Sequence, residues 1–187
     1  MNALFGLAAE VQSFCKSRQW RFCFIGGIAL QRWGEPRLTR DVGLTIVTGF
    51  GGEDVFVDAL SGAFRQRVPH AREFALRNRV LLLQSPRGIP IDVSLGGLAF
   101  EERVAERSSG FAFLPGVTLR TCSSEDLVVL KAFADRARDW ADIEGILART
   151  VVEWNTVRDE LEPLCEAKEA PHILPRLLAL GDSTRHG

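Results

Sequence analysis

The sequence predicts an α/β (α+β) protein in which helices flank a mixed β-sheet and further helices follow. Two observations predict this class. In residues 1–122, short apolar runs alternate with segments of helical periodicity, whereas from residue 123 onward every segment has helical periodicity. We therefore expect two domains: an α/β core of residues 1–122, and a C-terminal helical subdomain of residues 123–187 packed on that core.

Apolar periodicity and turn residues predict the individual elements. The expected helices are residues 3–18, 28–33, 53–64 and 98–107, and the expected strands are residues 21–25, 41–47, 79–84, 89–95, 111–113 and 117–120. Ser85-Pro86-Arg87-Gly88 is typical of a hairpin connection, which makes the sheet mixed. Ser123-x-x-Asp126 is a capping-box pattern, and three or four helices are expected from there to about residue 180.

Composition narrows the class of protein further. The chain has 187 residues, a hydrophobic fraction of 46% and a net charge of −1. This charge argues against broad electrostatic capture of nucleic acid. No apolar run approaches the ~18 residues needed to span a bilayer, and Glu10 interrupts the apolar N-terminal stretch where a signal peptide would continue. We expect a cytoplasmic protein that does not bind membranes.

A glycine pair followed by alternating polar residues is the first candidate functional motif. Gly26 and Gly27 follow an expected strand and precede a helix, so the backbone can approach a phosphate at the positive end of the helix dipole. Arg37, Thr39, Asp41 and Gly43 then alternate, and on a strand all four would point to one face. A glycine turn alone is more often structural, but the added polar face favours a ligand site.

Asp92 is the second candidate, because it lies among apolar residues in a position where a central strand holds an aliphatic one. A carboxylate there needs a cation or metal partner, or else belongs to an edge strand that faces water. Together with Asp41 on a neighbouring strand, Asp92 would form an oxygen-rich site for Mg²⁺ or Mn²⁺.

These residues resemble the nucleotidyltransferase superfamily, specifically its AbiEii-like and minimal-nucleotidyltransferase branch. The family pattern is a glycine turn, then Arg-x-Thr-x-Asp-x-Asp, then a third Asp on a neighbouring strand. The matching positions are Gly26, Gly27, Arg37, Thr39, Asp41 and Asp92. The segment from Lys131 through Arg138, Asp139 and Asp142 is similar to a further family motif, and the resemblance covers residues 20–150.

The resemblance implies a nucleotidyltransferase fold, a nucleoside triphosphate substrate and a role for each residue. Asp41 and Asp92 would hold the metal, Lys131 would contact phosphate, and Arg138 would help to bind the nucleotide. The remaining matching residues of the glycine and Arg-x-Thr motifs, Gly26, Gly27, Arg37 and Thr39, would also be nucleotide-binding. From the residues alone, Lys131 could equally be a lysine that extends from a core helix to solvent.

Gly43 is the departure from the pattern, because it replaces the second carboxylate of Asp-x-Asp. Three explanations are open: a non-catalytic protein that binds nucleotide, replacement of the lost carboxylate by Glu35 or Glu53, or one metal ion held by Asp41 and Asp92. The corresponding functions are transfer of a nucleotidyl group to a hydroxyl of RNA, protein or a small molecule, and nucleotide binding by a pseudoenzyme. The branch also includes toxins that act on tRNA or protein, so an antitoxin is an expected partner. A structural interaction module would leave the polar face unexplained.

Overall fold

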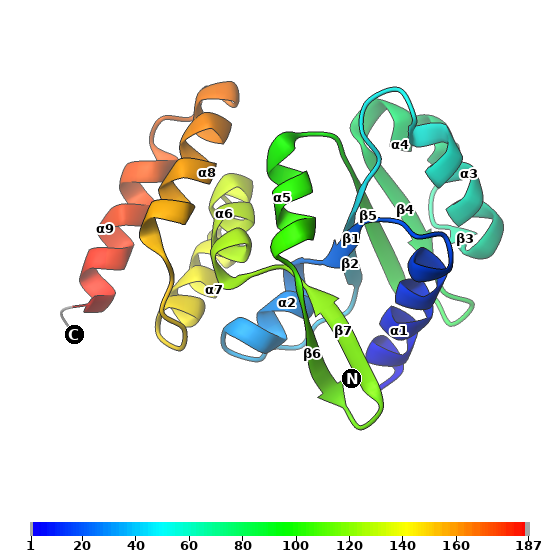
Figure 1. The fold of residues 1–187 in the computed structure, drawn as a ribbon, viewed down its shortest axis with the longest axis horizontal. Helices are drawn as coiled ribbons and strands as arrows, with labels where there is room; N and C mark the ends of the chain where they lie inside the picture. The colour runs from blue at the N-terminus through cyan, green and yellow to red at the C-terminus, as the bar shows by residue number, and fades with distance from the viewer. Residues whose placement is uncertain (1, 186–187) are drawn as a thin grey trace. The chain divides into compact units, whose positions relative to one another are not determined.

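The computed structural model describes residues 2–185 and divides the chain into two compact units. The first unit comprises Met1–Ile28 and Leu38–Cys122 and holds the sheet (Figure 1). The second comprises Ala29–Arg37 and Ser123–Gly187, and its described residues form helices and the loops that join them. The domain bounds predicted from the sequence did not assign residues 29–37 to the helical unit.

A seven-stranded mixed sheet forms the first unit, with the strand order β3-β4-β5-β2-β1-β7-β6. The strands are β1 Phe22–Phe24, β2 Val42–Val47, β3 Arg65–Gln66, β4 Val80–Gln84, β5 Pro90–Gly96, β6 Ser109–Leu114 and β7 Val117–Thr121. β2 pairs in parallel with β5 and antiparallel with β1, while β4 and β5 form the predicted hairpin. The predicted mixed sheet is therefore confirmed.

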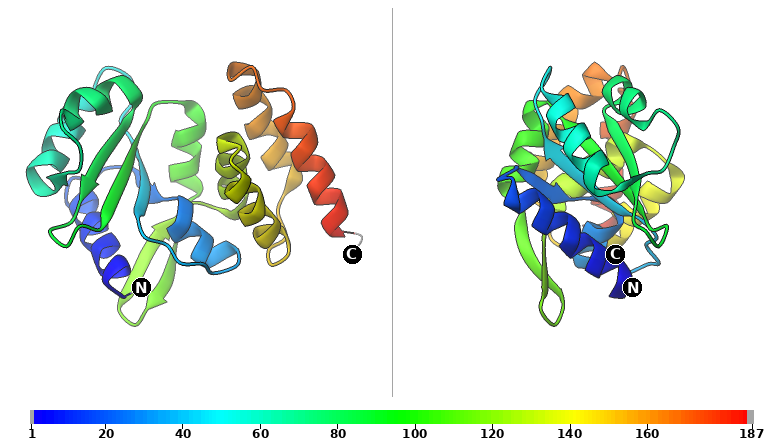
Figure 2. Two further views of the ribbon diagram at one scale, coloured as in Figure 1. Left: turned by 180° about the vertical axis from the view of Figure 1, so that it is seen from behind. Right: turned by 90° about the vertical axis from the view of Figure 1, so that its right-hand side faces the viewer.

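The two faces of this sheet differ in what covers them (Figures 1 and 2). Strand residues such as Leu44 and Val93 share one buried cluster with residues of helices α1 (Asn2–Ser17), α3 (Glu53–Ala63) and α4 (Ala71–Asn78). Helix α5 (Ala99–Arg107) packs on the opposite face, where the Cys23 thiol lies 3.9 Å from the Val104 carbonyl oxygen. Because side chains alternate along a strand, Gly43 and Asp92 belong to this opposite face.

The second unit consists of the end of α2 and four C-terminal helices. Their bounds are α2 Gly26–Trp33, α6 Ser124–Ala134, α7 Ala137–Leu147, α8 Trp154–Ala167 and α9 Ile173–Arg185. The predicted cap is confirmed at the start of α6, where the Ser123 hydroxyl accepts a hydrogen bond from the Asp126 N–H at 3.1 Å. Residues 29–37 contact the segment that follows α7, since the Thr150 hydroxyl donates to the Trp33 carbonyl at 2.8 Å.

The structure corrects the sequence prediction at three places. β2 begins at Val42, so Arg37 and Thr39 lie in a loop and do not share a strand face with Gly43. β3 and α4 were not predicted, because β3 has two residues and α4 is a mostly polar helix with too little apolar periodicity. Among the described residues, no helix is both long and apolar enough to cross a membrane.

Candidate functional site

Gly27 and Thr39 form the first part of the candidate site, within the sheet unit. Gly26 has a φ of +57°, a left-handed conformation that favours glycine, and it begins helix α2. A Cβ at Gly27 would lie 2.6 Å from the Thr39 side chain, and the Thr39 hydroxyl donates to the Gly27 carbonyl at 3.3 Å. Thr39 is buried. It therefore fixes the loop against the start of α2, a positioning role that explains why glycine and threonine occur together.

Asp41 and Asp92 form the second part. Asp41 immediately precedes β2, and Asp92 lies on β5, where its Cα pairs with that of Gly43. Burial raises the pKa of the Asp92 carboxyl above its usual value; the Arg67 guanidinium opposes this rise, and the negative charge of Asp41 adds to it. The charge of Asp41, which precedes β2, thus acts on Asp92 of the neighbouring strand β5.

The carboxylates of Asp41 and Asp92 suit one hard cation better than two. Among residues 2–185, no group of three or more His, Cys, Asp or Glu side chains is arranged to hold a metal ion. Mg²⁺ commonly keeps several waters and binds one or two carboxylates together with substrate phosphates. Two carboxylates, those of Asp41 and Asp92, would be enough for a single Mg²⁺ ion that also binds substrate phosphates.

Gly43 leaves an open position beside these carboxylates. A Cβ built there would be 3.7 Å from the Ile25 carbonyl oxygen and 3.9 Å from the Ile25 side chain, which are ordinary contact distances. Glu53, one of the acids considered as a replacement, instead forms an ion pair with Arg79. The described residues therefore supply no third carboxylate at the position that Gly43 leaves vacant.

Arg67 is a residue of this region that the sequence analysis missed. Its guanidinium Nη2 lies 2.6 Å from Asp92 Oδ1. The pair could not be found from the sequence, because Arg67 follows a two-residue strand that carries no periodic signal and is 25 residues from Asp92.

The second unit contains a separate cluster of paired charges. Lys131 on α6 lies 2.6 Å from Asp142 and 3.1 Å from Asp139, both on α7, and all three side chains are buried. Arg37 binds Asp142 with two hydrogen bonds of 2.7 and 2.8 Å, and Arg136 pairs with Asp139. Asp139 and Asp142 are therefore not a solvated surface pair, and they anchor this network.

The network changes the interpretation of the predicted phosphate ligands. The ammonium of Lys131 contacts two carboxylates, so it does not extend into solvent, and the guanidinium of Arg37 is committed to Asp142. Arg138 is exposed on α7. Arg136 was missed, although its spacing of three residues before Asp139 is the helical signal that could have found it.

Asp142 makes the stability of this unit dependent on pH. Burial alone would raise the pKa of its carboxyl, but hydrogen bonds from Arg37 and Lys131 outweigh burial and hold the pKa below its usual 3.8. A carboxyl with a depressed pKa stabilises the fold above its unfolded pKa, and this stabilisation is lost as the pH falls through the folded pKa.

We therefore expect the wild-type protein to be more stable than Asp142→Asn at pH 7, with the difference shrinking as the pH falls from about 5 towards 3. Urea titrations at several pH values measure this difference. A difference that stays constant over the whole range would show that the ion pair does not lower the pKa of Asp142.

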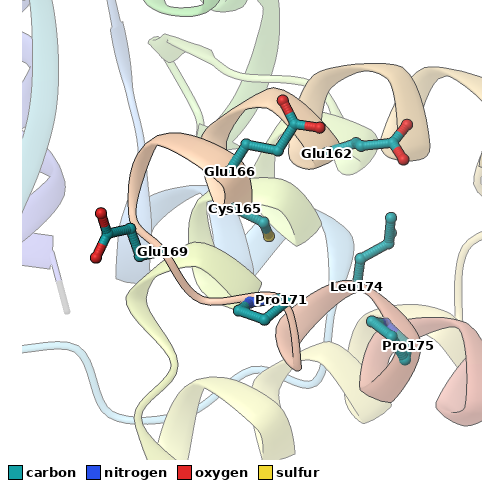
Figure 3. A pocket seen from close by; sticks show the side chains of 7 residues that line it. All are labelled: Glu162, Cys165, Glu166, Glu169, Pro171, Leu174 and Pro175. Carbon is teal, nitrogen blue, oxygen red and sulfur yellow. The ribbon is translucent and has the colours of Figure 1, made fainter.

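A cavity of about 550 Å³ lies between α8 and α9 in the second unit (Figure 3). Cys165 and Leu174 contribute to its apolar lining, and Glu162, Glu166 and Glu169 surround it. No predicted site residue lines this cavity, and its carboxylates have the wrong charge for a triphosphate. It is therefore not a candidate nucleotide site.

Comparison with solved structures identifies the fold class as that of nucleotidyltransferases. An antigenic nucleotidyltransferase-like protein from Paracoccidioides brasiliensis superposes with a TM-score of 0.57 at 15% identity, over 97% of this chain and 93% of that one. The antibiotic-resistance factor ANT(2'')-Ia superposes with a TM-score of 0.50 at 15% identity, over 100% of this chain and 99% of that one. At this level of identity, the similarity establishes the fold.

The family follows from the sequence. Residues 17–183 match the family model described as "Nucleotidyl transferase AbiEii toxin, Type IV TA system". Because this match spans most of the chain, the protein belongs to the AbiEii nucleotidyltransferase family, as the motif resemblance predicted. No curated protein matches the chain.

Proposed function

We propose that this protein is a Mg²⁺-dependent nucleotidyltransferase that moves a nucleoside monophosphate from a nucleoside triphosphate to an acceptor hydroxyl. The observation that carries the proposal is the placement of Asp41 directly before β2 and of Asp92 on the neighbouring strand β5, in the same unit as the glycine start of α2. Carboxylates for a cation and backbone N–H groups for phosphates are the two features that binding of a metal–nucleotide requires.

In the proposed reaction, the acceptor hydroxyl oxygen forms a bond to the α-phosphorus of the nucleotide. The bond between that phosphorus and the oxygen bridging to the β-phosphate breaks, pyrophosphate leaves, and the hydroxyl proton is released to solvent. Asp41 and Asp92 would hold Mg²⁺ (or Mn²⁺), which neutralises charge on the pyrophosphate. Gly26, where a Cβ would meet nothing within 4 Å, would let the phosphates approach the backbone at the start of α2, while Gly27 makes room for Thr39.

The charged network of the second unit supports a contribution to phosphate binding. Three cations, Lys131, Arg37 and Arg136, contact the two carboxylates of this network. We propose that Lys131 and the exposed Arg138 attract phosphate groups to this unit, with Asp139 and Asp142 holding Lys131 in place.

A second candidate function is nucleotide binding without transfer. Gly43 favours it, because the coordination sphere has lost a carboxylate. The two functions are separated by incubating the protein with Mg²⁺, a radiolabelled triphosphate and candidate RNA, protein or small-molecule acceptors. Label transferred to an acceptor supports the enzyme, whereas bound but unreacted nucleotide supports the pseudoenzyme.

The family description also suggests a biological role as the toxin of a type IV toxin–antitoxin pair. We propose that role, with an antitoxin as partner and tRNA or protein as acceptor. Growth arrest on expression that is relieved by an Asp41→Ala substitution would support it. Equal growth with the wild-type protein and this variant would contradict a toxin activity that depends on the metal site.

Calorimetric titration of Mg²⁺–ATP and Mg²⁺–GTP tests the proposed site. We expect Asp41→Ala to weaken binding at least about tenfold, because one of two charged metal ligands is lost. Asp54→Ala is the matched control, since Asp54 is an aspartate of the same unit that pairs with Arg72 at the surface. Unchanged binding by Asp41→Ala would place the nucleotide site elsewhere. Absence of binding by every protein would show that only the fold is inherited.

A further inference from the structure

Arg67 lies in one cross-strand row with Asp92 and Gly43, all within the sheet unit. The Arg67 N–H donates to the Leu82 carbonyl at 3.0 Å, immediately beyond the β3–β4 pairing. Leu82 pairs with Asp92, and Asp92 pairs with Gly43. Residues paired across neighbouring strands point to the same face, so the Arg67 side chain passes over Leu82 to reach Asp92.

Arg67 and Asp92 form an ion pair, and both side chains remain partly exposed to solvent. Nη2 of Arg67 and Oδ1 of Asp92 are 2.6 Å apart, while 28% of the Arg67 side chain and 41% of the Asp92 side chain are exposed. A guanidinium carries five N–H donors in a planar fork, and its contact with Asp92 uses one N–H group. Arg67 therefore keeps further N–H groups that can donate hydrogen bonds to the oxygen atoms of another anion.

Gly43 is the last residue of this row, and it has no side chain. Among residues 2–185, no third carboxylate joins Asp41 and Asp92 in a group that could hold a metal ion. Arg67 is the fixed positive charge that the fold supplies at Asp92. Arginine suits this role because its planar donors match phosphate oxygens and it is always charged.

We propose that Arg67 is a ligand of the triphosphate, supplying beside Asp92 the positive charge that a second metal ion would otherwise supply. This inference rests on the proposed function of the site. It makes two predictions of opposite sign. Removing the charge of Arg67 weakens binding of a metal–nucleotide, because a charge-assisted hydrogen bond is lost. The same change strengthens binding of a divalent cation alone, because a competing positive charge leaves Asp92.

The experiment measures both quantities on the full chain. Binding of Mn²⁺ alone is followed by electron paramagnetic resonance, and binding of Mg²⁺–ATP by calorimetry, for the wild type and Arg67→Gln. We expect Arg67→Gln to bind the nucleotide about tenfold more weakly and Mn²⁺ more tightly. Arg65→Gln is the matched control, since it removes an exposed arginine of β3, two residues before Arg67, and should change neither affinity.

Arg67→Lys keeps the test valid if Arg67→Gln does not fold, as judged by thermal unfolding. It retains the charge but loses the fork, so its affinity for Mn²⁺ should equal that of the wild type while its affinity for the nucleotide falls. Equal nucleotide binding by the wild type and both variants would overturn the inference and leave the proposed function intact. Tighter binding of both ligands by Arg67→Gln would show that Arg67 competes with the metal. No nucleotide binding by the wild type would instead reject the proposed function.

Discussion

Replacing Lys131 by methionine is expected to lower the free energy of unfolding by about 3 kcal/mol, the lower end of the cost of removing one partner from a buried ion pair. Methionine retains the length of the side chain but removes the ammonium that lies between Asp139 and Asp142. The lower end applies because Arg37 and Arg136 still pair with these carboxylates.

Urea titration followed by tryptophan fluorescence measures this effect. The second unit contains three of the four tryptophans, Trp33, Trp140 and Trp154, so its unfolding dominates the signal. Lys168→Met is the matched control: Lys168 is exposed and binds the Phe133 carbonyl, and its loss should cost no more than about 1 kcal/mol. Similar losses in the two variants would mean that Lys131 is solvated, and the proposal that Asp139 and Asp142 hold it would fail.

Replacing Gly43 by aspartate is expected to strengthen binding of Mn²⁺ or Mg²⁺ about 30-fold, or ~2 kcal/mol. The new carboxylate would start from a Cβ with ordinary contacts to Ile25, on the same sheet face as Asp92. The metal-free variant should be less stable than the wild type, because three carboxylates then repel one another. Added metal should reverse this loss, since a ligand that binds only the folded state stabilises it.

Thermal unfolding with and without Mg²⁺, together with calorimetry, checks this prediction. Gly43→Asn is the matched control, because it has nearly the same size and carries no charge. If Gly43→Asn and Gly43→Asp change the affinity for the metal equally, the metal does not contact the side chain at position 43. If Gly43→Asp also increases transfer to an acceptor, the loss of this carboxylate limits catalysis in the natural protein.

The sequence predicted the elements whose apolar periodicity is long enough to be read. The first helix, the hairpin strands and the cap at Ser123 were confirmed because their signals are local: spacing of apolar residues, turn residues and a hydroxyl three residues before an acid. The start of β2 agrees with the prediction within one residue, but Arg37 and Thr39 lie in a loop, because alternation of polar residues also occurs in an extended loop. β3 was missed because two residues contain no period.

For the candidate site, the sequence identified residues but not what they contact. Arg37 and Thr39 were expected on one face, yet Thr39 packs on Gly27 while Arg37 binds Asp142. The contact between Arg37 and Asp142 joins residues 105 positions apart, and that of Arg67 with Asp92 joins residues 25 apart. Local patterns carry no information about such pairs.

The sequence by itself determined the fold class, the family and the absence of a carboxylate at Gly43, since these depend on periodicity, on motif spacing and on residue identity. Only the tertiary structure decided that Lys131 is held between two aspartates and that Arg67 lies on Asp92. The physical reason is that the energy of a charge depends on its burial and on its nearest opposite charge. Both are set by segments that the chain brings together only on folding.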